Sequence, residues 1–103
     1  MIRIALALLI FALPAHAEWT TAQRTTFLRD CTSSCEGGFA PNDPLKTKCG
    51  GVCRCVAEQA ETFMTPADYD RVDAANQANR KDPLRDRMDA LLPPCARKML
   101  QQR

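Results

Sequence analysis

Six cysteines constrain this chain more than any other feature of its sequence. Cys31 and Cys35 form one C-x3-C pair, and Cys49 and Cys53 form a second. Residues 36–48 between them contain two glycines and two prolines, which is the composition of a loop. Side chains four residues apart lie on the same face of a helix, so each pair presents two sulfurs in a row. The spacing predicts a helical hairpin whose two rows of cysteines face each other.

The direction of the second helix decides how these four cysteines pair. A chain that folds back at a loop of this composition gives antiparallel helices, and the rows then meet in reverse order. This arrangement predicts the disulfides Cys31–Cys53 and Cys35–Cys49. Parallel helices would instead join Cys31 to Cys49 and Cys35 to Cys53.

The remaining two cysteines are Cys55 and Cys95. Cys55 lies two residues after Cys53, about 200° around a helix, and therefore faces away from the hairpin seam. It is left to pair with Cys95. Six cysteines allow about 15 pairings in all, and spacing alone does not exclude the others.

The N-terminus indicates that the chain is exported. Arg3 precedes an apolar run over residues 4–13, and the small-x-small triplet 15–17 follows Pro14. This is the order of a cleavable secretory signal. A retained membrane anchor is the alternative, but a spanning helix needs about 20 apolar residues and this run has about half of them. We expect a signal peptide over 1–17, no membrane span after its cleavage, and a periplasmic or secreted domain over 18–103 in which disulfides form.

Helix signals dominate the rest of the chain. Thr20 and Gln23 have the form of a capping box, and the Thr65-Pro66 and Asp82-Pro83 steps each combine an N-cap with a proline at the first helical position. We expect helices that end near 37, and over 49–63, 66–80 and 83–92, the last stopped by prolines at 93 and 94. The predicted fold is all-α: one small domain made of a disulfide-stapled hairpin and two or three additional short helices.

Composition argues against several functions. Losing Arg3 lowers the net charge from +2 to +1, so we expect no dedicated nucleic-acid surface. The only histidine, His16, lies in the signal segment, which leaves no Ser-His or Cys-His dyad for hydrolysis. Zinc sites favour C-x2-C spacing and histidine ligands. We therefore expect no enzyme activity, no metal and no cofactor.

Two aromatic residues stand out as candidate partner contacts. Trp19 precedes the first helix cap and Phe39 lies in the loop, so neither is an obvious core residue. Exposed aromatic side chains are typical anchors of protein interfaces. The alternative is that both pack over the hairpin, because a small domain has little else to cover its disulfides.

The sequence is similar to known proteins in two ways. The twin C-x3-C hairpin resembles, in geometry only, the small Tim chaperones and the plant alpha-hairpinins. These families shield hydrophobic precursors or act as inhibitors and antimicrobial peptides. Over nearly the whole mature chain, the Trp19-Thr20 start, the Cys53-Arg54-Cys55 step and the late Cys95 resemble small exported bacterial proteins without an assigned role.

The interpretation that follows is a non-enzymatic accessory module that binds another protein. One alternative is a thiol-disulfide redox protein that uses Cys53 and Cys55, since Arg54 would favour a thiolate. Another is a secreted inhibitor or toxin-like peptide.

Overall fold

The computed structural model describes residues 18–102, and all of its regular structure within that range is helical. Its elements are α1 (Thr21–Gly37), a short 3-10 helix η1 (Pro44–Lys48), α2 (Cys49–Ala60), α3 (Pro66–Gln77), α4 (Pro83–Asp89) and α5 (Leu92–Gln101). The expected all-α fold, with a hairpin and three additional helices, is confirmed. The expected signal peptide over 1–17 lies outside the described residues.

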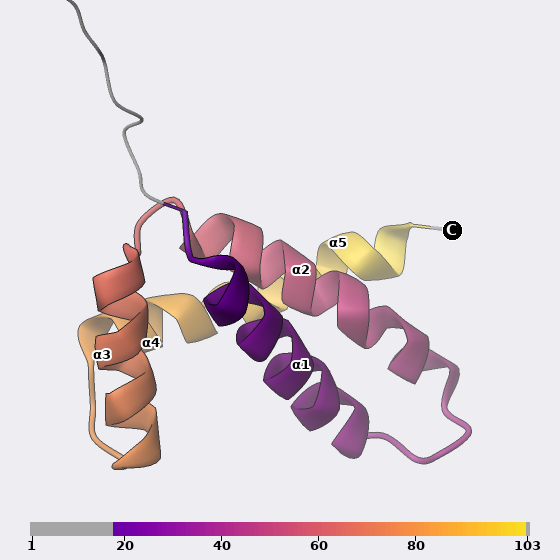
Figure 1. Cartoon of the computed structure of the whole chain (residues 1–103). Coiled ribbons are helices and arrows are strands. Elements are labelled where there is room, and N and C mark those ends of the chain that lie inside the picture. The colour runs from indigo at the N-terminus through magenta and orange to yellow at the C-terminus, as the bar shows by residue number, and fades with distance from the viewer. Residues whose placement is uncertain (1–17, 103) are drawn as a thin grey trace, which may run out of the picture.

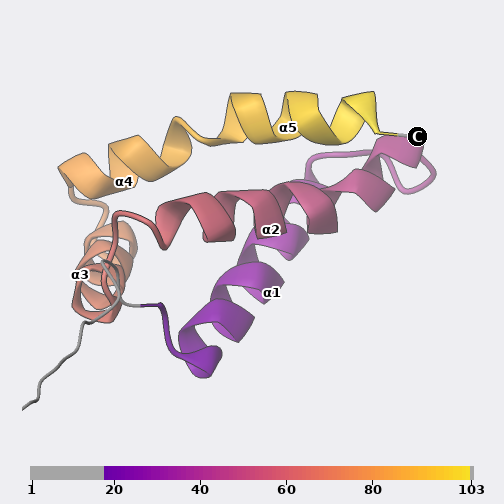
Figure 2. The same cartoon turned by 90° about the horizontal axis from the view of Figure 1, so that it is seen from above.

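The helices α1 and α2 form an antiparallel hairpin closed by the loop that contains η1 (Figure 1). Helix α5 runs back along α2, on the side of α2 away from α1 (Figure 2). Its C-terminal end lies close to η1, where the Lys48 Nζ donates to the Gln102 carbonyl oxygen at 3.4 Å. The helices α3 and α4 lie at the open end of the hairpin (Figure 1).

Three helix starts are fixed by side chains that satisfy free backbone groups. The Thr20 hydroxyl accepts from the Gln23 N–H and the Gln23 side chain accepts from the Thr20 N–H, both at 3.0 Å. Thr65 and Asp68 make the same reciprocal pair at α3. Asp82 caps α4 by accepting from the Leu84 N–H at 2.8 Å. The predicted caps therefore begin these helices where the sequence places them.

Helix α3 ends at Gln77, three residues before the expected boundary. Asn79 adopts a left-handed backbone with φ of 54°. The Arg80 N–H then bonds to the Ala75 carbonyl at 2.7 Å, and the Asn79 N–H bonds to the Asn76 carbonyl. This is a Schellman ending with asparagine in place of the usual glycine, and it was not visible in the helical pattern.

The prolines at 93 and 94 do not stop a helix, so that expectation was wrong. Helix α4 already ends at Asp89, and the two prolines occupy the first turn of α5. The first N–H groups of a helix have no partner within it, so the missing proline N–H costs nothing at this point. Helix α2 is also shorter than expected and ends at Ala60.

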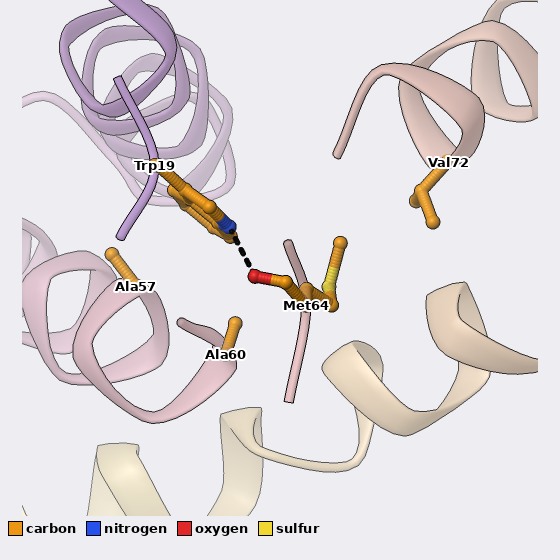
Figure 3. Close-up of a cluster of buried hydrophobic side chains, with 5 residues drawn as sticks. All are labelled: Trp19, Ala57, Ala60, Met64 and Val72. Atoms are coloured by element: carbon orange, nitrogen blue, oxygen red, sulfur yellow. Dashed lines mark hydrogen bonds between the residues drawn. The ribbon is translucent and has the colours of Figure 1, made fainter. Parts of the chain in front are cut away.

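The main core lies where α2, α3 and the N-terminal segment meet. Its buried members are Trp19, Ala57, Ala60, Met64 and Val72 (Figure 3). A second cluster surrounds Cys55, Val56 and Cys95 and joins α2 to α5. Close contact between these two helices also involves Gly51, because a Cβ at that position would lie 2.6 Å from the Met99 Sδ.

Candidate functional site

The structure contains three disulfides: Cys31–Cys53, Cys35–Cys49 and Cys55–Cys95. The first two join α1 to α2 across the hairpin seam, and the third joins α2 to α5. The first two are the pairs that antiparallel C-x3-C rows predict, because the inner and outer cysteines of the two helices meet in reverse order. The third joins the two cysteines that these rows leave over.

The redox alternative required a reversible bridge between Cys53 and Cys55. The two sulfurs belong to different bridges on different faces of α2, and both residues are buried. No free cysteine occurs among residues 18–102. The structure therefore contains no Cys53–Cys55 bridge, and each of these cysteines is bonded to a cysteine of another helix.

Trp19 is not an exposed partner contact, which corrects one of the two sequence candidates. Its side chain is 3 % exposed and makes edge-to-face contacts with Phe27 and Tyr69, at ring-centroid distances of 5.4 and 4.8 Å. The indole N–H donates to the Met64 carbonyl at 3.2 Å (Figure 3). Burial of a ring this large removes a large apolar area from water and so stabilises the domain.

An ion pair between residues that are distant in the sequence holds this segment in place. The Trp19 backbone N–H donates to the Glu61 Oε1 at 2.9 Å. The same carboxylate receives two hydrogen bonds from the Arg24 guanidinium, which raises the Arg24 pKa. Glu61 lies in the turn after α2, 37 residues from Arg24, and nothing in local spacing pairs them.

Phe39, the other sequence candidate, lies in an exposed apolar groove between η1 and α5. The groove has a volume of about 390 Å³. We define the apolar groove by Phe39, Leu45, Val52, Leu92 and Leu100, which line it together with Cys35, Lys48, Cys49, Pro93 and Ala96. Lys48 is the only charged residue among them.

The leucines of this groove are unusually accessible. Leu45 is 40 %, Leu92 44 % and Leu100 58 % exposed. The spacing of Leu92, Ala96 and Leu100 places them on one side of α5, while Cys95 and Met99 contact α2. One face of α5 thus holds the helix in the fold, and the adjacent face leaves apolar surface to solvent.

A second hollow, of about 590 Å³, lies between α1 and α3. Its lining is apolar inside, with Val56, Met64 and Val72 buried, and acidic at its edge, with Asp30, Asp73 and Asp89 exposed. We call it the acid-rimmed cleft. Cys35 and Leu92 line both this cleft and the apolar groove, so the two hollows adjoin each other.

Tyr69 reports the electrostatics of the acid-rimmed cleft. Partial burial raises its pKa, and the negative charges of Asp73, Asp30 and Asp70 raise it further, against a smaller opposing effect of Arg29. The neighbourhood of this phenol is therefore negative.

Residues 18–102 hold no group of three or more metal-ligating side chains. None of the helices within those residues is both long and apolar enough to span a membrane.

No family model matches this sequence, and neither the curated proteins nor the solved structures that were compared with it gave a match. The class of the protein therefore comes from its own structure: a small all-α domain held together by three disulfides, of a kind typical of oxidising compartments outside the cytoplasm.

Proposed function

We propose that this chain is an exported, non-enzymatic module that binds an apolar segment of another protein in the apolar groove. The observation that carries the proposal is the exposure of three large leucines along one hollow, with Leu100 at 58 %. Small monomeric domains keep apolar surface of this kind where it contacts a partner.

The covalent framework supports this role. The groove is lined by Cys35 and Cys49 from one disulfide and by α5, which a second disulfide attaches. A surface held by covalent bonds loses little conformational entropy when it binds. The smaller entropy cost increases the affinity for a partner. The bridges thus supply a rigid apolar surface without a large core.

Export is supported by the signal-like N-terminus and by the disulfides together. A protein that binds an exported module must be in the same compartment, so the partner is exported as well. We therefore propose a periplasmic or secreted partner whose contact segment presents apolar side chains, such as one face of an amphipathic helix.

The test is capture of a partner from the exported fraction by purified wild-type protein, compared with Leu45→Ser and Leu100→Ser. Each serine variant should lower the affinity about fivefold or more, since a central apolar anchor is worth over about 1 kcal/mol. Leu100→Met is the matched control and should bind like the wild type. Folding should be unaffected, because substitutions at exposed positions change stability by about 0.5 kcal/mol or less.

Two outcomes would overturn the proposal. Capture that is unchanged in both serine variants would place the partner elsewhere. A wild-type dimer that Leu100→Ser converts to a monomer, measured by analytical ultracentrifugation, would show that a second copy covers the groove.

The exported protein used in these measurements should begin at Glu18 by mass spectrometry, and retention of residues 1–17 would contradict the proposed export route.

A further inference from the structure

The acid-rimmed cleft combines features that the protein-binding proposal does not use. Its floor is apolar and buried, formed by Val56 of α2, Met64 of the following turn and Val72 of α3. Phe27 and Tyr69 add two half-buried aromatic rings. Its volume of about 590 Å³ lies in the usual range of small-molecule sites, about 300 to 1,000 Å³.

The charge at the edge of this cleft comes from three separate helices. Asp30 belongs to α1, Asp73 to α3 and Asp89 to α4, and no lysine or arginine lines the cleft. The whole chain carries a net charge of +2, so a uniformly negative edge is not a consequence of overall composition. The tertiary fold places these carboxylates around one cleft.

The three carboxylates also keep much of their capacity to pair with a cation. Asp73 accepts from the neutral Gln77 amide at 2.9 Å, and Asp89 has no ion pair within residues 18–102. Asp30 contacts Arg29 at 3.1 Å, but both side chains are about two-thirds exposed and such a pair is weak. An entering cation would therefore meet partners that are not already neutralised.

We propose that the acid-rimmed cleft binds a small organic cation with an apolar body, such as an arylalkyl amine. The apolar body would cover the buried floor, and the ammonium group would lie among the carboxylates and the aromatic rings, both of which attract cations. The cleft is large enough to hold one such molecule. Its volume lies within the range of small-molecule sites, and we therefore favour a small molecule over a peptide.

Three probes with the same apolar body separate the contributions of shape and charge: phenylbutylamine, phenylbutanol and phenylbutyrate. The chain has one tryptophan, and both of its ring contacts line the cleft, so Trp19 fluorescence reports occupancy directly. Calorimetry gives the affinities independently. The amine should bind about tenfold more tightly than the acid, with the alcohol between them, and added salt should reduce this difference.

Substitutions of the carboxylates at the edge of the acid-rimmed cleft then test whether the amine binds there. Asp73→Asn and Asp89→Asn should each weaken amine binding by about threefold to fivefold and leave the alcohol unchanged. Glu58→Gln is the matched control: this exposed residue lies about 200° around α2 from Val56, away from the cleft, and should have no effect. Far-ultraviolet circular dichroism verifies that every variant keeps its helices.

Amine and acid binding with equal affinity, or an amine affinity that neither asparagine variant changes, would overturn the inference. A cationic amphipathic peptide that binds when the amine does not would overturn it too, in favour of a longer ligand. Leu100→Ser separates this site from the proposed function, because it removes partner capture at the apolar groove and should leave amine affinity unchanged.

Discussion

At the scale of single residues, a short contact set decides how the N-terminal segment joins the fold. Glu61 is buried and accepts from both the Trp19 N–H and the Arg24 guanidinium. Trp19 in turn lies between Phe27 and Tyr69. One carboxylate in a turn therefore fixes the position of the largest core side chain.

We expect Glu61→Ala to destabilise the domain by about 2 kcal/mol, because a charged hydrogen-bond acceptor is lost and a buried N–H is left without a partner. Glu61→Gln keeps an oxygen for the Trp19 N–H and should cost less. Urea unfolding followed by Trp19 fluorescence measures both. Equal stability of the alanine variant and the wild type would show that Arg24 and Trp19 find water or other partners at no cost.

At the scale of helices, Arg71 links the start of α3 to the start of α4. Its guanidinium donates to Asp68 and to Asp82, in each case at 3.1 Å. The pKa of Asp68 is lowered, and the largest cause is its hydrogen bond from the Thr65 N–H. The pKa of Asp82 is also lowered, chiefly by its hydrogen bond from Arg71. Both carboxylates therefore stabilise the folded state most when they are ionised.

A lowered pKa in the folded state sets the direction of the pH dependence. The unfolded chain binds protons more readily, so these two groups stabilise the fold above about pH 4 and lose that effect as the pH falls through their lowered pKa values. We expect helicity and thermal stability to decrease between about pH 4 and pH 2. Asp82→Asn, which still caps a helix, should flatten part of this decrease. A wild-type melting temperature that stays constant down to pH 2 would contradict the assignment.

At the scale of the whole molecule, the disulfides provide stability that a larger hydrophobic core would otherwise provide. Cys31–Cys53 and Cys35–Cys49 are nested in the hairpin, whereas Cys55–Cys95 closes a separate loop of 40 residues and attaches α5. Because α5 has one buried residue, Cys95, its attachment depends strongly on that bridge.

Replacing Cys55 and Cys95 together by serine should cost about 2 to 4 kcal/mol and speed amide hydrogen exchange in α5 while the hairpin stays protected. The matched control replaces Cys35 and Cys49, whose loop spans 14 residues. It should cost about 1 kcal/mol less in the loop-entropy model and leave α5 protected. Uniform loss of protection in both double variants would mean that the domain unfolds as a single unit.

Local chemistry in the sequence determined where three helices start and favoured the disulfide pairs that the structure contains. Caps at Thr20, Thr65 and Asp82 act within three residues, and C-x3-C rows follow from the 3.6-residue helical repeat, so both can be predicted without the tertiary fold. Helix ends were harder to predict, as the left-handed Asn79 and the two prolines at the start of α5 show. A helix boundary reflects small energy differences between alternative endings.

Only the tertiary structure decided which surfaces are free. Trp19 and Phe39 looked alike in the sequence, but Glu61, distant in the chain, holds Trp19 in the core while Phe39 lines an open groove. Asp30, Asp73 and Asp89 are far apart in the sequence, and the packing of three helices places all three around one cleft. Burial and charge clustering depend on contacts between distant segments, and spacing along the chain does not encode them directly.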